Sequence, residues 1–192
     1  LGLPSEAVLI VSSFQDDAVL ETAWRHRRSL IDSLASAGYD LATVPSFSLW
    51  GGDTRLEHRY NIARSLRMFE MLTEAGVPTI PHVSWYLRRD VDDWVKELRG
   101  WPGFPAFSLD LATLETEPDW AWLIHGLRRL MDGIGKGWEV LVNGVALRRR
   151  IREVADICGH IHLTNERPFQ LAMCQYETLD ELVTSRTRPT PK

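Results

Sequence analysis

Residues 80–85 read IPHVSW, and the alternation of apolar and polar side chains in this stretch decides between two fold classes. His82 and Ser84 fall on one face of the predicted strand, because successive side chains of a β-strand point to opposite faces. The central strands of an open parallel sheet carry apolar side chains on both faces, since helices cover both. A polar face on such a strand is instead typical of the inner mouth of a (β/α) barrel, where polar groups converge.

Three later strands of the predicted fold show the same polar phase. They cover residues 106–111, 138–145 and 160–164. In each strand, polar residues two or four positions apart share one face. These residues are Ser108 and Asp110, Glu139 and Asn143, and His160, His162 and Thr164. Four strands with one polar face favour a barrel, with an open doubly wound sheet as the alternative.

The rest of the chain continues this alternation of strands and helices. Predicted strands cover residues 7–13, 40–49, 79–85, 106–111, 138–145 and 160–164. Predicted helices run from Val19 to a stop at Gly38 and over residues 58–75, 91–99, 119–132, 147–157 and 168–184. Strands that alternate with helices in units of roughly 30 residues pair in parallel through right-handed crossovers. We therefore predict an α/β fold in which about six β/α units form a complete or partial TIM-barrel-like structure.

Length, composition and charge bound the functions that the chain can have. Its 192 residues, 44% of them hydrophobic, predict one domain over residues 1–183 and a polar, flexible tail at 184–192. A net charge of −4 excludes the broad basic field that drives nonspecific nucleic-acid binding. No apolar run approaches the ~18 residues of a membrane span. Cys158 and Cys174 form no disulfide framework, so we expect buried thiols in a cytoplasmic protein that does not enter membranes.

Three stretches between residues 43 and 85 carry a family resemblance. They read TVPSFSL at 43–49, YNIARS at 60–65 and GVPTIPHVSW at 76–85. These stretches resemble the TPDFSLY strand, the N..RSR helix and the G..VIPNVRW strand of a bacterial and phage family known as domain of unknown function 4417. His82 stands where that pattern has Asn, and Ser84 stands where it has Arg. The resemblance covers residues 40–90 and extends more loosely to 165, and it implies a β/α-repeat fold without implying a reaction.

A shorter likeness lies in the last predicted strand. Residues 159–166 read GHIHLTNE. This stretch resembles the HVHLKD strand of xylose-isomerase-like barrels, in which the second His and the acid face a metal. In this sequence Asn165 stands in place of the acid, and Glu166 follows it by one residue.

The carboxyl ends of the strands are where we expect reacting groups, because (β/α) barrels place their active sites there. Asp110 and Glu166 form the predicted acid/base pair, since two carboxylates with different pKa values can divide the two roles. Capping of the following helix, or pairing with an arginine, is the alternative role of each carboxylate. His82 is a third catalytic candidate.

A divalent metal is the cofactor that these residues could hold. His82, Asp110 and His162 would supply nitrogen and oxygen ligands from three strands and leave a position open for water. Hydrogen-bonded interior histidines are the alternative interpretation, and His160 is expected to be structural.

Substrate-binding candidates also follow the predicted strands. Trp50 and Trp85 lie at strand ends where they could wall a pocket. The glycines in the loop WGGD at 50–53 permit close backbone approach or a moving lid, with an ordinary tight turn as the alternative. The candidates are Trp50, Asp53, Arg55, Trp85, Asn143 and Asn165.

These observations predict an enzyme, a hydrolase or a lyase, that acts on a small polar substrate. The alternative is a noncatalytic barrel-like domain of a phage- or plasmid-associated protein. Such a domain would bind nucleic acid or a protein partner through Arg-rich helices, such as the one with Arg148, Arg149, Arg150 and Arg152. Arginine runs at the start of a helix are also common on solvated faces.

Overall fold

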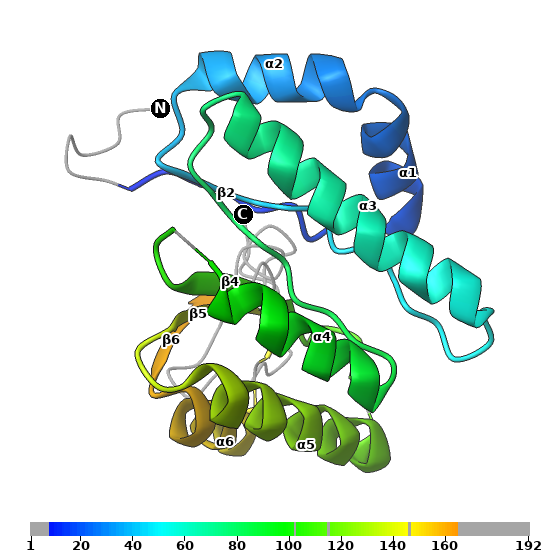
Figure 1. The fold of residues 1–192 in the computed structure, drawn as a ribbon, viewed down its shortest axis with the longest axis vertical. Helices are drawn as coiled ribbons and strands as arrows, with labels where there is room; N and C mark the ends of the chain where they lie inside the picture. Colours follow the sequence, from blue (N-terminus) through cyan, green and yellow to red (C-terminus); the bar gives the residue numbers. More distant parts are fainter. Residues whose placement is uncertain (1–7, 102, 115, 146, 165–192) are drawn as a thin grey trace, which may run out of the picture. The chain divides into compact units, whose positions relative to one another are not determined.

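The computed structural model of the chain describes residues 8–101, 103–114, 116–145 and 147–164 (Figure 1). It divides into two compact units, Leu1–Leu109 and Asp110–Lys192, which we call unit 1 and unit 2 and describe separately. Within the described ranges the fold is mixed α/β, with six helices and two three-stranded parallel sheets. None of the described helices is both long enough and apolar enough to cross a membrane.

Unit 1 contains one parallel sheet and four described helices. Its elements are β1 (Ile10–Val11), α1 (Asp17–Arg25), α2 (Arg27–Ala37), β2 (Leu41–Thr43), α3 (Arg55–Glu74), β3 (Thr79–Ile80) and α4 (Arg88–Arg99). The strand order is β1-β2-β3, and both pairings are parallel. The carboxyl ends of the three strands therefore meet at one edge of this sheet.

The core of unit 1 lies between its sheet and helices α2 and α3, which pack side by side (Figure 1). Ile31 of α2, Ala42 of β2 and Met68 and Leu72 of α3 are buried together there. The start of α3 is fixed by a capping box, because Thr54 and Glu57 exchange side-chain and backbone hydrogen bonds.

One predicted helix of unit 1 is two helices in the structure, with a break at His26. Arg27 donates a hydrogen bond from its Nη1 to the Trp24 carbonyl oxygen at 2.8 Å, and its guanidinium lies over the Trp24 ring. This bond satisfies a carbonyl that the end of α1 leaves without a helical partner. The hydrophobic pattern continues through the break, so periodicity alone could not show it.

Unit 2 contains two packed helices and two strands of the second sheet, together with the last residue of the third strand, β4. The elements from the unit boundary onward are β4 (Ala106–Asp110), α5 (Glu117–Ile134), β5 (Glu139–Asn143), α6 (Arg148–Cys158) and β6 (His160–Thr164). The strand order is β4-β5-β6, and β5 and β6 are parallel from Glu139–His160 to Asn143–Thr164. Helices α5 and α6 lie side by side (Figure 1). Val140, Val142 and Val154 are fully buried, so β5 and α6 contribute to the core.

The alternation of strands and helices predicted from the sequence is confirmed in the described residues, but no closed barrel is present there. The strands of unit 1 are shorter than predicted, since β2 ends at Thr43 and β3 at Ile80. Gly38 ends α2 in a left-handed conformation, as expected, whereas α5 continues past Gly133 to Ile134. The predicted helix at 168–184 and the tail at 184–192 lie outside the described residues.

Candidate functional site

A row of three polar side chains lies at the carboxyl ends of β4, β5 and β6. Asn143 donates from Nδ2 to Oδ1 of Asp110 at 3.1 Å, and Thr164 donates from Oγ1 to Oδ1 of Asn143 at 3.2 Å. We call Asp110, Asn143 and Thr164 the strand-end row. All three residues are half-buried, so the row is held by the protein and still borders solvent.

Backbone contacts hold the ends of these strands close together. Leu111 N donates to the carbonyl of Asn143 at 2.9 Å, and Gly144 N donates to the carbonyl of Thr164 at 3.1 Å. Gly144 has a φ of +80°, and a Cβ at this position would lie 2.4 Å from Cα of Ala112. Only glycine therefore lets the turn after β5 approach the turn after β4 this closely.

Asp110 is the residue of the row that can accept a proton. Its Oδ1 accepts hydrogen bonds from Asn143 and from the backbone N–H of Ala112, the latter at 3.0 Å. Within the described part of the chain, Oδ2 accepts no hydrogen bond. A carboxylate with one oxygen fixed and the other open can bind a substrate hydroxyl or act as a general base.

A histidine–carboxylate pair lies on the same face of the second sheet. Nε2 of His162 is 2.9 Å from Oε2 of Glu139, and Nδ1 of His160 is 4.0 Å from Oε1 of the same carboxylate. The register places His162 two residues before Thr164 on β6, on the face that carries the strand-end row. The His162 side chain is 64% exposed, so this pair is open to solvent.

His82 belongs to unit 1 and is buried, with 2% of its surface exposed. Its Nδ1 lies 3.3 Å from Oγ of Ser108, and the two residues form an isolated parallel bridge. Phe14 contacts the imidazole edge-to-face at a centroid distance of 5.8 Å. His82 is therefore a hydrogen-bonded interior histidine, the alternative that the sequence left open for it.

The predicted substrate-binding residues of unit 1 differ in exposure. Trp50 is 54% exposed, and its Nε1 donates to Oδ2 of Asp17 at 3.1 Å. Trp85 is 6% exposed and belongs to the core. The Asp53 backbone N–H closes a turn onto the Trp50 carbonyl at 3.1 Å. Arg55 forms a two-point ion pair with Asp90.

The residues that carry the family resemblance form a clasp between α3 and the segment after β2. Asn61 Nδ2 donates to the Ser48 carbonyl at 2.7 Å, and Ser65 Oγ donates to the Pro45 carbonyl at 2.8 Å. Arg64 donates to Asn61 and Glu21 and lies 3.9 Å from the centroid of the Phe47 ring. This clasp fixes the segment that leads to Trp50.

The arginines of α6 are partly engaged within unit 2. Arg149 and Arg150 both bond to Glu117 of α5, and Arg150 also stacks over Trp120. Hydrogen bonds from Arg149 and from Arg150 hold the pKa of Glu117 below its usual range. Two of the four guanidinium groups of this helix therefore join it to α5.

Cys158 is not a nucleophile in this fold. Burial raises the pKa of its thiol to about 12, so the reactive thiolate does not form near neutral pH. The residue is 1% exposed, which confirms the expected buried thiol, and Cys174 lies outside the described residues.

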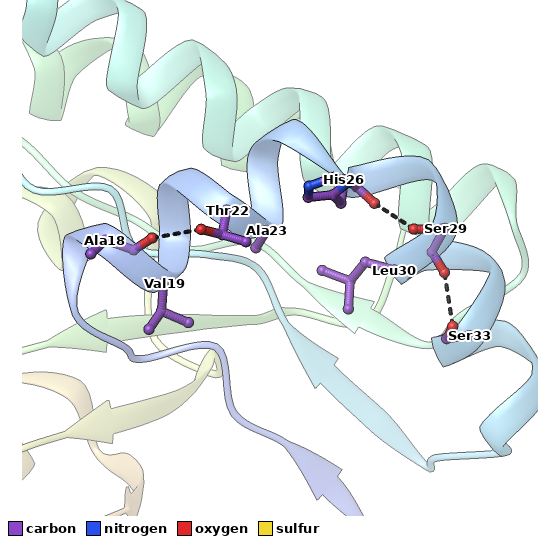
Figure 2. Close-up of a pocket in the computed structure, with 8 residues that line it drawn as sticks. All are labelled: Ala18, Val19, Thr22, Ala23, His26, Ser29, Leu30 and Ser33. Atoms are coloured by element: carbon purple, nitrogen blue, oxygen red, sulfur yellow. Dashed lines mark hydrogen bonds between the residues drawn. The ribbon is translucent and has the colours of Figure 1, made fainter.

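A groove along α1 and α2 offers little polar chemistry (Figure 2). Thr22, Ser29 and Ser33 donate their hydroxyl protons to the carbonyls of Ala18, His26 and Ser29 on their own helices. The remaining lining is mostly apolar or small, so the groove carries no candidate for catalysis.

The described residues contain no cluster of three or more His, Cys, Asp or Glu side chains that could hold a metal. Asn165 and Glu166 lie outside the described residues. Two residues of the site were missed as candidates from the sequence, Thr164 and Glu139. Thr164 shares a face of β6 with His162, and Glu139 shares a face of β5 with Asn143, because alternate residues of a strand point to the same side. This alternation is visible in the sequence and could have identified both residues.

The comparisons with known proteins give a family and no activity. Residues 5–135 match the model of a family described as Domain of unknown function (DUF4417). Among curated proteins, none matches the chain.

Proposed function

This chain belongs to the family Domain of unknown function (DUF4417), and we propose that it is a hydrolase or lyase that acts on a small polar substrate at the strand-end row. The observation that carries the proposal is the linked set of Asp110, Asn143 and Thr164 at the carboxyl ends of three adjacent parallel strands. Parallel α/β folds place their reacting groups at this edge.

Each residue of the row has a role in the proposed reaction. Asp110 accepts the proton from water or from a substrate hydroxyl at Oδ2, while Asn143 and the Ala112 N–H hold Oδ1. Thr164 fixes the Asn143 amide, because its hydroxyl donates to the amide oxygen. Glu166, two residues later in the sequence, is the proposed second carboxylate, and His162 with Glu139 is a further proton donor or acceptor.

We propose further that the six β/α units follow the order of an incomplete barrel. The strand topology supports this proposal, because the strand orders are β1-β2-β3 and β4-β5-β6. In addition, an isolated parallel bridge joins His82, two residues after β3, to Ser108 of β4. Within each sheet consecutive strands are thus neighbours, whereas a doubly wound sheet reverses its order.

Partner binding through the arginines of α6 has less support. Arg149 and Arg150 are bonded to Glu117, and among the arginines of this helix only Arg148 and Arg152 form no ion pair with another described residue. A helix that binds nucleic acid neutralises several phosphates, and two arginine side chains are too few for this.

The enzyme proposal is tested with chromogenic p-nitrophenyl esters, phosphates and glycosides, turned over by the wild type, Asp110→Asn and Asp132→Asn. Asp132 is an exposed carboxylate of α5 and serves as the matched control. We expect one substrate class to be hydrolysed by the wild type and by Asp132→Asn, with a loss of at least about 100-fold in Asp110→Asn. Absence of turnover in all three classes would exclude a hydrolase of these substrates, and equal turnover in Asp110→Asn would overturn the proposed role of Asp110.

A further inference from the structure

A groove of about 330 Å³ lies between α3 and α4 in unit 1, and none of the residues of the proposed reaction lines it. Ile62, Ala63 and Leu66 of α3 and Trp94 of α4 give it an apolar lining. Trp94 is fixed, since its Nε1 donates to the Ser84 carbonyl at 2.7 Å. The groove is at the small end of the size range of ligand pockets, which suits a ligand of about one ring.

Arg55 lines this groove and has a donor that lacks an acceptor. Its Nη1 and Nη2 bond to both carboxylate oxygens of Asp90. Its Nε–H is buried and has no hydrogen-bond partner among the described residues. A buried donor of a charged group without an acceptor is costly, so such a group commonly meets a ligand or an ordered water.

Arg59 lies one helical turn after Arg55 and also lines the groove. It is exposed, and within the described ranges no carboxylate pairs with it. The two arginines therefore place two guanidinium groups on one wall, and no described residue accepts a hydrogen bond from the Arg59 guanidinium.

The carboxylates that line the groove are mostly engaged. Asp90 accepts from Arg55 and from the backbone N–H groups of Tyr86 and Leu87. Asp93 is 3.2 Å from Nζ of Lys96. Glu97 is the remaining carboxylate on the α4 wall, and its charge opposes the binding of an anion.

We propose that the α3–α4 groove binds a small organic anion, with a carboxylate or phosphate group at Arg55 and Arg59 and an apolar body against Ile62, Leu66 and Trp94. Guanidinium groups bind both kinds of oxyanion through charge-assisted hydrogen bonds. The apolar body distinguishes this ligand from an inorganic anion, which has nothing to place on the lining of the groove.

The proposal is tested by calorimetric titration of the full chain with phenylacetate, phenyl phosphate, inorganic phosphate and uncharged 2-phenylethanol. We expect binding of at least one phenyl anion and at least about tenfold weaker binding of inorganic phosphate and of phenylethanol. Phenylacetate and phenyl phosphate serve as two arms, which separate a carboxylate ligand from a phosphate ligand.

Variants locate the binding on the groove. Arg59→Gln should weaken the phenyl anion at least about tenfold, whereas Arg67→Gln, on the same helix and paired with Glu70, should leave it unchanged. Glu97→Gln should strengthen binding, because it removes a negative charge from the opposite wall. Lack of binding by both phenyl anions, equal binding of inorganic phosphate, or equal loss in both arginine variants would overturn the proposal. Each result is independent of turnover at Asp110.

Discussion

Gly144 is the residue on which the spacing of the strand-end row depends. Its φ of +80° is unfavourable for any residue with a side chain, and a Cβ would meet Ala112 at 2.4 Å. Gly38 also has a positive φ, +69°, in a left-handed conformation, but a Cβ there would meet no atom within 4 Å. The two glycines therefore separate the cost of the backbone conformation from the cost of the close approach.

Gly144→Ala should destabilise the protein by more than 2 kcal/mol, roughly the sum of left-handed strain and overpacking. Gly38→Ala should cost about 1 kcal/mol, from strain alone. Urea unfolding curves measure both free energies of unfolding. If the two variants lost equal stability, the close approach of Gly144 to Ala112 would not be a constraint.

At the scale of the elements, α4 is joined to α3 by Asp90, which is 4% exposed. Burial alone would raise the pKa of Asp90, but hydrogen bonds from Arg55, Leu87 and Tyr86 outweigh it, and the pKa is lowered. A lowered pKa means that the folded state favours the carboxylate. The stabilisation is therefore present above the unfolded pKa of about 3.9 and is lost as the pH falls through the lower folded pKa.

Asp90→Asn should lower the free energy of unfolding by about 3 kcal/mol at pH 7, because it leaves the Arg55 charge without its partner. The difference from the wild type should narrow as the pH falls below about 4, because the unfolded wild type takes up a proton at Asp90 there while the folded state still favours the carboxylate. Unfolding curves in urea between pH 7 and pH 3 measure this. Asp93→Asn is the control, because Asp93 forms an exposed ion pair with Lys96, and it should lower the free energy of unfolding by less than about 1 kcal/mol. If the difference in free energy of unfolding between Asp90→Asn and the wild type did not change with pH, the account would be contradicted.

Helices were predicted from the sequence more accurately than strands. The helix predicted over 58–75 is α3, Arg55–Glu74. It begins earlier than predicted, at Arg55, because the capping box at Thr54 fixes its start. The strand predicted over 40–49 ends at Thr43, because Val44 and Phe47 are buried in the clasped segment rather than in a ladder. Apolar character indicates burial, and it does not say whether the backbone bonds to a neighbouring strand.

At the scale of the whole molecule, the sequence could predict which residues share a sheet face but not which of them touch. The alternation of polar and apolar residues along the strands predicted Asp110, Asn143 and His162 as site residues. The register of β5 and β6 places Asn143 and His162 on one face of the sheet, as this alternation predicted. The bonds that link Asp110 to Asn143 and Asn143 to Thr164 depend on the approach of Gly144 to Ala112, which no periodicity encodes. The division of the chain into two units was also not predicted.

The central claim is that Asp110 and Asn143 act as one catalytic unit. It is tested most directly by kcat/KM of Asp110→Asn, Asn143→Ala and the double variant, measured on the substrate that the wild type hydrolyses. We expect each single change to lower kcat/KM at least about 100-fold and the double change to lower it little further, since residues that act as a unit are not additive. Losses that multiply in the double variant, or a single variant with wild-type kcat/KM, would contradict the claim.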